Sequence, residues 1–261
     1  MKENLLQKFK EKIGRYPVFG PFCKTSDPGI IEVLGHAGFD FIILDMEHGP
    51  SNLETIQNLI RAAEIAEIIS IVRVSAGDYE MISKVLDVGA DGVQVPQVST
   101  PQAVERALRS AKFAPLGERG VCRFVRAAGY SSTEKNNYFQ QANDALLIIQ
   151  LEGKEALQNL NEILKVKGPD IIFIGPYDLS QSLGFTGDIE HPLVIEKTKE
   201  IVKACINQGI AVGNFTESPT QTGFWTRQGL RYMSFSVDMG MMYNASRDLV
   251  RELHRECETD T

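Results

Sequence analysis

A cluster of ionisable residues follows an apolar run within residues 41–49, FIILDMEHG. The run itself, FIIL, is typical of a strand that is buried on both faces. Asp45, Glu47 and His48 come directly after it, so carboxylate and imidazole groups leave one buried strand just before a chain reversal at Gly-Pro. In a barrel of parallel strands, the carboxyl ends of the strands form the mouth where active sites are built. We therefore expect these three side chains to lie in an active site.

Two further carboxylates, Glu152 and Asp178, follow apolar runs later in the chain, within IIQLEG and FIGPYD, and no lysine is adjacent to either. If the two strands are neighbours, each carboxylate raises the pKa of the other unless a cation lies between them. Oxygen ligands favour Mg²⁺, Mn²⁺ or Co²⁺ over a cysteine-bound Zn²⁺. The alternative is that each carboxylate caps the helix that follows its strand.

A histidine and an arginine add acid–base and anion-binding chemistry. The spacing of Asp45 and His48 allows the carboxylate to orient the imidazole and raise its basicity, although a histidine bonded to backbone is the alternative. Arg73, within IVRVS, needs an anionic partner if it points into a barrel mouth, either Glu47 or a substrate carboxylate. A metal, an arginine that binds a substrate carboxylate, and a base together favour a 2-keto acid as the substrate and an enolate as the intermediate. We expect Lys84, Lys112, Lys154 and Lys165 to lie in helices or loops and not at strand ends, which disfavours a Schiff-base mechanism.

Eight apolar strand segments alternate with helical segments, after an N-terminal amphipathic helix over residues 1–17. Strands are expected at residues 18–24, 39–45, 68–74, 92–98, 145–151, 170–174, 210–214 and 232–237. Eight such units close into an α/β fold of the (β/α)₈, or TIM-barrel, type. An open doubly wound sheet is the competitor, but no GxGxxG or GxxxxGK[ST] motif follows a strand. We predict one barrel domain over residues 1–261, with the irregular residues 112–143 as an active-site loop insertion.

Composition narrows the partners and the location. The chain of 261 residues is 43% hydrophobic and carries a formal net charge of −7, with both signs interspersed. This charge disfavours nucleic acid and an anionic membrane surface as partners, although one or two local arginines suffice for an anionic substrate. Four scattered cysteines, no signal-peptide core and no apolar run of the ~18–20 residues that span a bilayer predict a cytoplasmic protein with free thiols.

Five segments together resemble a known family: LDMEHGP, KVLDVGADGVQVPQV, PLGERGV, QLEG and FIGPYDLSQSLG. They are similar to the metal-dependent class II pyruvate aldolases of the HpcH/HpaI type, which include 4-hydroxy-2-oxoheptanedioate, 2-keto-3-deoxy-rhamnonate and 2-dehydro-3-deoxyglucarate aldolases. The resemblance runs from about residue 18 to residue 250. It implies a barrel of the phosphoenolpyruvate/pyruvate type, whose C-terminal helix is exchanged with a neighbouring subunit in a homohexamer, a trimer of dimers.

The resemblance also implies catalytic roles. His48 is the base, paired with Asp45, and Arg73 stabilises the developing enolate. Asp87 matches an acidic residue that raises the basicity of the histidine. Because Asp87 is expected near the end of a helix, at the wrong end of its own barrel, it could act only from an adjacent subunit.

Apart from Arg73, the implied binding residues lie at the ends of two strands. The metal ligands are Glu152 and Asp178. The residues that bind the pyruvyl part of the substrate are Arg73, Gln150, Gly175, Pro176, Tyr177 and Asp178. Tyr177 departs from the family, in which a small alanine stands at this position. The segment RGVCRFVRAAGYS is more basic than in the dicarboxylate-cleaving members. We therefore expect this segment to select the aldehyde half of the substrate, either anionic or polyhydroxylated.

These residues predict a carbon–carbon lyase that reversibly cleaves a 4-hydroxy-2-keto acid to pyruvate and an aldehyde, through a pyruvate enolate stabilised by a divalent metal. One alternative is a lyase similar to the citrate lyase β subunit or malyl-CoA lyase, which would need a groove for coenzyme A. The other is a non-catalytic barrel subunit. So many convergent charges disfavour the silent barrel, because they have no structural use.

Overall fold

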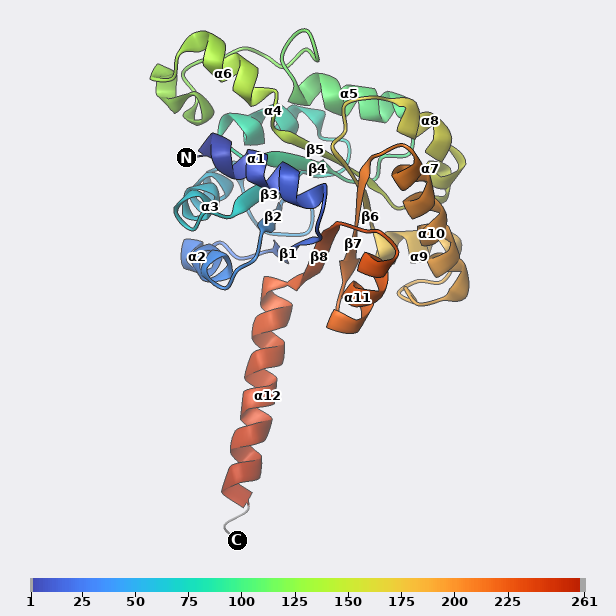
Figure 1. Ribbon diagram of the computed structural model, residues 1–261. Helices are drawn as coiled ribbons and strands as arrows, with labels where there is room; N and C mark the ends of the chain where they lie inside the picture. The colour runs from blue at the N-terminus through green and yellow to red at the C-terminus, as the bar shows by residue number, and fades with distance from the viewer. Residues whose placement is uncertain (1, 259–261) are drawn as a thin grey trace.

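The strands form one closed barrel. A computed structural model describes residues 2–258, in which eight parallel strands pair in sequence order and β8 pairs with β1 (Figure 1). The strands are β1 Val18–Cys23, β2 Phe41–Asp45, β3 Ile69–Arg73, β4 Gly92–Val95, β5 Leu146–Leu151, β6 Ile171–Ile174, β7 Ala211–Thr216 and β8 Tyr232–Val237. The predicted (β/α)₈ barrel is confirmed, because strands that are apolar on both faces pack against each other inside and against helices outside.

Helices cover the outside of the barrel: α1 Lys2–Ile13, α2 Pro28–His36, α3 Leu53–Ile65, α4 Tyr79–Asp87, α5 Pro101–Ala111, α6 Lys135–Ala142, α7 Lys154–Gln158, α8 Leu160–Lys165, α9 Pro176–Leu183, α10 Pro192–Asn207 and α11 Pro219–Arg227, with α12 Asp238–Glu258 at the end. The side chains of Asp27, Asn52, Asp78 and Thr100 each accept a backbone N–H of the first turn of their helix. The sequence predicts Asp27, Ser51 or Asn52, and Asp78 as caps and a helix that opens at Thr100, and the structure agrees with these positions.

Some local structure differs from the prediction. The sequence predicts the next helix after the sixth strand at residues 192–208, but helix α9 begins directly after β6. The sequence also predicts one helix over residues 155–164, but the structure divides this stretch between α7 and α8 at Asn159. Residues 112–143 are partly regular, because the 3₁₀ helix Arg126–Ser131 and α6 pack there around a small apolar cluster of Phe113, Ala128 and Tyr138.

The 112–143 segment lies at the amino end of the barrel, opposite the mouth. It connects the end of α5 to the start of β5, and in this fold every helix-to-strand connection lies at that end. The Lys112 ammonium donates to the backbone oxygens of Asn143, at 2.7 Å, and Ala145, at 2.5 Å, which ties the two ends of the segment together. The predicted role of this segment in an active site therefore requires the mouth of another subunit.

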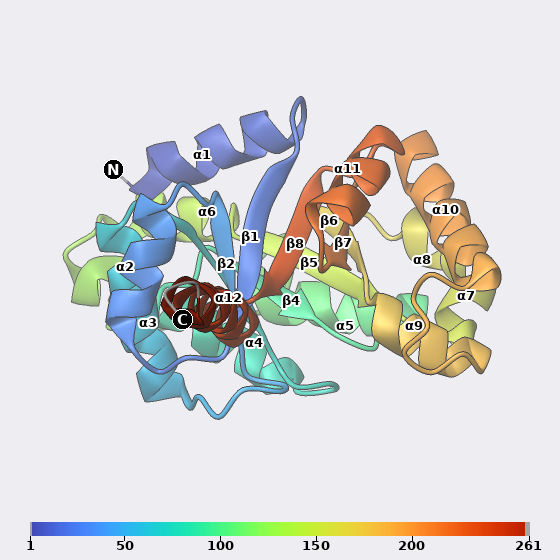
Figure 2. The ribbon, with the colours of Figure 1, turned by 90° about the horizontal axis from the view of Figure 1, so that it is seen from below.

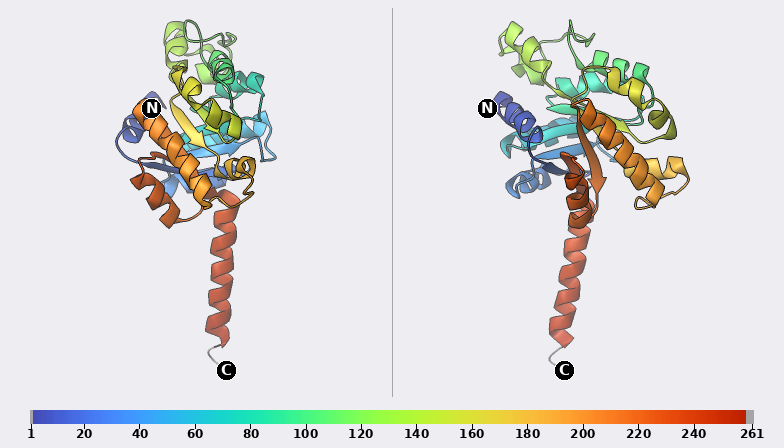
Figure 3. Two further views of the ribbon diagram at one scale, coloured as in Figure 1. Left: turned by 90° about the vertical axis from the view of Figure 1, so that its right-hand side faces the viewer. Right: turned by 45° about the vertical axis from the view of Figure 1, so that its right-hand side comes forward.

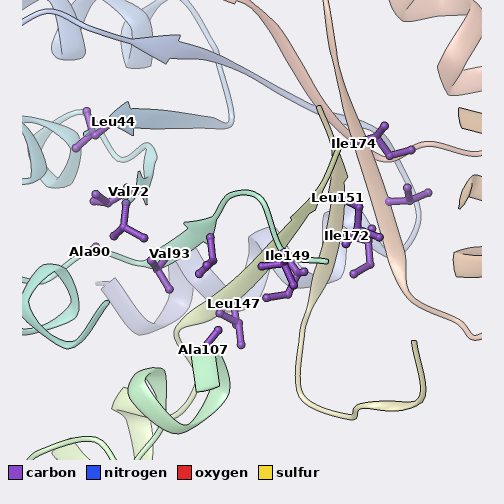
Figure 4. Packing of buried hydrophobic residues seen from close by; sticks show 14 of the residues in the cluster. Leu44, Val72, Ala90, Val93, Ala107, Leu147, Ile149, Leu151, Ile172 and Ile174 are labelled. Atoms are coloured by element: carbon purple, nitrogen blue, oxygen red, sulfur yellow. The ribbon is translucent and has the colours of Figure 1, made fainter. Parts of the chain in front are cut away.

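Apolar side chains form two layers. The inner layer fills the barrel and includes Phe41, Ile43, Ile71, Phe173 and Tyr232, while α1 closes the amino end with Phe9 and Ile13. The outer layer lies between strands and helices and includes Leu44, Val72, Val93, Leu147 and Ile149 (Figure 4). Because successive residues of a strand point to opposite faces, Phe41, Ile43 and Asp45 share the inner face of β2. This register places the Asp45 carboxylate inside the mouth.

Helix α12 projects from the barrel as a separate rod (Figures 1 and 3), and Figure 2 shows it end-on. Its large apolar side chains are exposed, among them Met242, Tyr243, Leu249, Val250 and Leu253. Such a row is typical of a helix that packs on another surface. Among residues 2–258, no helix is both long enough and apolar enough to cross a membrane.

Candidate active site

Asp45 and Arg73 form a buried ion pair at the mouth. They are directly opposite each other in the pairing of β2 with β3. Arg73 Nε donates to Asp45 Oδ1 at 2.9 Å and Nη2 donates to Oδ2 at 2.7 Å, the bidentate geometry of a strong pair. Burial alone would raise the pKa of Asp45, but the hydrogen bonds and charge of Arg73 outweigh it and hold that pKa below its ordinary value. Asp45 therefore stays ionised and fixes the guanidinium.

The rest of the Arg73 guanidinium faces Glu47 and an aromatic ring. Arg73 Nη1 lies 3.4 Å from Glu47 Oε2. The guanidinium carbon lies 4.4 Å from the centre of the Phe22 ring, which is cation–π contact distance. Burial raises the pKa of Glu47, although Arg73 works in the opposite direction. Of the two anionic partners that the sequence allows for Arg73, the structure thus contains Glu47. A substrate carboxylate that binds Arg73 would share the guanidinium with Glu47.

His48 lies at the rim of the mouth with an exposed imidazole. In this structure the Asp45 carboxylate binds the Arg73 guanidinium, and the expected pairing of Asp45 with the His48 ring stays a prediction. Asp45 Oδ1 also accepts the backbone N–H groups of Glu47, at 3.1 Å, and His48, at 3.2 Å, which turns the chain after β2. His48 Nε2 lies 3.9 Å from Glu47 Oε2. An exposed imidazole at this rim is accessible to a substrate, and its role as the base stays a prediction.

A chain of buried amides positions Glu152. Gln94 Nε2 donates to Gln150 Oε1 at 2.6 Å, and Gln150 Nε2 donates to Glu152 Oε2. The Gln97 backbone N–H donates to the other carboxylate oxygen at 2.8 Å. Gly175 leaves room for this arrangement, since a Cβ at that position would collide with the Glu152 carboxylate and contact Gln150. Two residues that the sequence assigns to the substrate, Gln150 and Gly175, therefore also hold Glu152 in place.

Glu152 is a buried carboxylate, and none of its interactions within residues 2–258 is with a cationic side chain. Burial, and then the negative charges of Asp178 and Glu47, raise its pKa to about 7, although the hydrogen bonds from Gln150 and Gln97 act in the opposite direction. Glu152 does not cap α7, because Gly153 precedes that helix and no side chain caps it. A carboxylate in this state is suited to bind a cation.

Asp178 is the second predicted metal ligand. It follows Gly175, Pro176 and Tyr177 and lies, exposed, in the first turn of α9. Its charge contributes to the raised pKa values of Glu152 and Glu47. Within residues 2–258, no group of three or more His, Cys, Asp or Glu side chains is arranged to hold an ion by itself. Two carboxylates therefore fit a hard divalent cation that keeps several waters, such as Mg²⁺, rather than a closed site.

Asp87 lies at the other end of the barrel, as the last residue of α4. Arg119 Nη2 donates to Asp87 Oδ1 at 2.5 Å, and Arg126 Nη1 donates to the backbone oxygen of Val88 at 3.0 Å. Within one chain, Asp87 and His48 are thus at opposite ends. The predicted role of Asp87 requires an adjacent subunit. If Asp87 lies at the mouth of that subunit, Arg119 and Arg126 lie near that mouth as well.

Sequence reasoning missed one wall of the mouth. The Phe22 ring, which contacts Arg73, lies 6.0 Å from the Phe215 ring, and the Tyr177 ring lies 6.1 Å from the Phe215 ring. Phe22 and Phe215 alternate along β1 and β7 with outward residues, and this alternation could have identified them as inward groups. Glu217 follows β7 directly, and nothing in its local sequence marked it.

The sequence model of one protein family, described as HpcH/HpaI aldolase/citrate lyase, matches residues 19–245. The chain belongs to this family. Its relatives include the 2-dehydro-3,6-dideoxy-6-sulfogluconate aldolase of Pseudomonas putida, 33% identical over 88% of this chain and 90% of the relative. They also include the hydroxypyruvate/pyruvate aldolase of Roseobacter denitrificans, 32% identical over 94% of this chain and 96% of the relative. The HpcH/HpaI resemblance predicted from the sequence motifs is confirmed.

Solved structures of the HpcH/HpaI family share the fold. A family protein from Burkholderia cenocepacia J2315 superposes with a TM-score of 0.89 at 29% identity, covering 95% of this chain and 99% of its own. The citrate lyase β subunit of M. tuberculosis, solved with oxaloacetate and magnesium, is distant: 15% identity and a TM-score of 0.54, over 87% of this chain and 93% of its own. That likeness shows the fold alone, so the aldolase prediction is supported over the citrate-lyase alternative.

Proposed function

We propose that this protein is a divalent-metal-dependent aldolase that reversibly cleaves a 4-hydroxy-2-keto acid to pyruvate and an aldehyde. The observation that carries the proposal is one barrel mouth that contains Arg73, fixed by Asp45, together with the buried carboxylate of Glu152. The first group suits an anionic substrate and the second suits a cation. The aldolases among the relatives, which match over most of the chain, support the same reaction.

Cleavage needs a base at the 4-hydroxyl group and stabilisation of the enolate. In our proposal, His48 takes the hydroxyl proton while the C3–C4 bond breaks. The electron pair of that bond forms the enolate of pyruvate, and the aldehyde leaves. Arg73, held in orientation by Asp45, donates to the developing oxyanion. Protonation of the enolate at C3 then gives pyruvate.

Glu152 and Asp178 would hold the cation, for which we propose Mg²⁺, Mn²⁺ or Co²⁺. Bound there, it would supply Lewis-acid stabilisation of the charge on the keto oxygen. Gln150 and Gly175 serve this site by positioning Glu152. Only the deprotonated carboxylate binds a cation. When no cation is bound, the hydrogen bond from Gln150 still gives the Glu152 carboxylate a polar partner.

Assembly and location are proposals of the same kind. We propose a homohexamer, a trimer of dimers, in which α12 packs on a neighbouring subunit and Asp87 serves a neighbouring mouth. The uncovered apolar side chains of α12 support the first point, and the position of Asp87 at the amino end supports the second. Its four free cysteines agree with a proposed cytoplasmic location. Sedimentation of the full chain, compared with a chain that lacks residues 240–258, measures the assembly.

The deciding experiment is exchange of the pyruvate methyl protons in D₂O, followed by NMR with Mg²⁺, Mn²⁺ or Co²⁺ and with EDTA as a control. Enolate chemistry predicts exchange that requires the metal and is strongly slowed in Arg73→Lys. Arg61→Lys is the matched control, because Arg61 is exposed on α3 and bonds Asn58. No exchange, together with no metal binding, would contradict the proposal.

A further inference from the structure

Two side chains meet at the rim of the mouth beyond the catalytic groups. Tyr177 lies in the first turn of α9, after β6, and Glu217 follows β7 directly. These strands are paired with Ile174 opposite Asn214. Tyr177 and Glu217 therefore follow neighbouring strands at the mouth, and the Tyr177 hydroxyl interacts with the Glu217 carboxylate. Tyr177 is also adjacent in sequence to Asp178, the proposed metal ligand.

Packing and hydrogen bonds hold this part of the rim in place. The Tyr177 ring packs 6.1 Å from Phe215, which continues the aromatic wall that begins beside Arg73. The Glu217 backbone N–H donates to Gln221 Oε1 at 3.0 Å, and Gln221 Nε2 donates to Glu190 Oε1, in the loop between α9 and α10, at 2.8 Å. The Tyr177 ring and the Glu217 backbone are therefore both held by neighbouring side chains.

We propose that Tyr177 and Glu217 form the specificity-determining pair for the aldehyde half of the substrate, and that they favour an uncharged hydroxyaldehyde over an aldehyde that carries an acid group. This inference rests on the proposed aldolase function. The Glu217 carboxylate accepts hydrogen bonds from substrate hydroxyl groups, and the Tyr177 hydroxyl offers both a donor and an acceptor. An acid group on the aldehyde would meet the Glu217 charge beside Asp178, which selects against it by repulsion.

The basic residues that the sequence assigns to aldehyde selection are elsewhere in the chain. Arg119 and Arg126 lie at the amino end, where they pair with Asp87 and Glu64. Within one subunit they supply no cation to the mouth. Selection of an anionic aldehyde would thus depend on a neighbouring subunit, whereas selection of a neutral one needs only the rim of the same chain.

The test compares two aldehydes of two carbons each, glycolaldehyde and glyoxylate, as acceptors for pyruvate. The measured quantity is the ratio of their kcat/KM values. We expect the wild type to prefer glycolaldehyde, and Glu217→Gln to reduce this preference by about fivefold to tenfold, mainly through better use of glyoxylate. Tyr177→Phe should lower kcat/KM for glycolaldehyde more than for glyoxylate. Glu196→Gln, which removes an exposed carboxylate from α10, is the matched control and should leave the ratio unchanged.

Proton exchange of pyruvate, which needs no aldehyde, separates the outcomes. A wild type that prefers glyoxylate, or a ratio unchanged in Glu217→Gln while exchange persists, overturns this inference and leaves the proposed function intact. A wild type with neither exchange nor product from either aldehyde contradicts the proposed function, and the inference with it. Glu217 is exposed, so its substitution is compatible with folding, and exchange by the variant verifies that directly.

Discussion

Asp45→Asn should destabilise the protein and weaken catalysis through Arg73. The substitution keeps the size of the side chain but removes the charge that receives two hydrogen bonds from the guanidinium, at 2.9 and 2.7 Å. Both groups are buried, so Arg73 would lose its main counter-charge and retain only the longer contact to Glu47 at 3.4 Å. Breaking one partner of a buried pair costs about 3–5 kcal/mol. We expect a loss of about 3 kcal/mol in the free energy of unfolding, because Glu47 compensates in part.

Urea unfolding, followed by the fluorescence of the single Trp225, measures this loss. Its pH dependence has a definite sign. The pKa of Asp45 is lowered in the folded state, so its contribution is full above the unfolded pKa of about 4 and is lost as the pH falls below that value. The difference between wild type and Asp45→Asn should therefore be constant near neutral pH and shrink in acid.

Kinetics distinguish the partner of Asp45. If Asp45 acts through Arg73, as the structure shows, Asp45→Asn and Arg73→Lys should slow pyruvate exchange to similar extents, and the double variant should be little worse than either. If Asp45 instead tunes His48, Asp45→Asn should lower the apparent pKa of the base in the pH–rate profile. Unfolding free energy within about 1 kcal/mol of wild type, with such a shift in the profile, would refute the reasoning.

Three further predictions follow from the site. Glu152→Gln should abolish metal-dependent activity, measured as pyruvate exchange with each metal, and full wild-type activity in EDTA would refute the metal assignment. His48→Ala should remove aldol cleavage while calorimetry still detects metal binding, whereas unchanged turnover would leave His48 as an ordinary rim residue. Gly175→Ala should lower metal affinity by about tenfold or more, because its Cβ collides with the Glu152 carboxylate; Gly120→Ala, which meets no atom within 4 Å, is the control, and equal affinity in both variants would contradict the positioning role.

The barrel could be predicted because its strands carry their own signal. Runs such as FIILD and LLIIQL are buried along their whole length, and side-chain caps mark where several helices begin. Helix α9 could not be predicted as easily, because it is short, contains two serines and starts at a proline directly after β6. Its apolar residues, Leu179 and Leu183, show helical spacing, but over a single repeat this signal is weak.

The residue types of the site could be predicted from the sequence, but the side chain that each of them binds could not. Sequence spacing placed Asp45 near His48, three residues away, but the structure pairs Asp45 with Arg73, which is distant in sequence. The reason is strand register: β2 and β3 set the two side chains opposite each other on the inner face. A bidentate pair with an arginine is stronger than a hydrogen bond with a neutral imidazole. Register is a property of two segments together, so spacing within one segment does not reveal it.

Two separate predictions from the sequence concern residues that lie at the amino end of the barrel. Asp87 was assigned to the tuning of the histidine, and the 112–143 segment to the aldehyde. The structure links them, because Arg119 binds Asp87 and Arg126 binds the backbone oxygen of Val88. Since α4 and this segment lie at the same end, a neighbouring subunit that receives one must also receive the other. Loss of assembly should therefore remove the contribution of Asp87 to base strength together with any contact of the 112–143 segment with the substrate, whereas the aldehyde selection that we propose for Tyr177 and Glu217 belongs to a single chain.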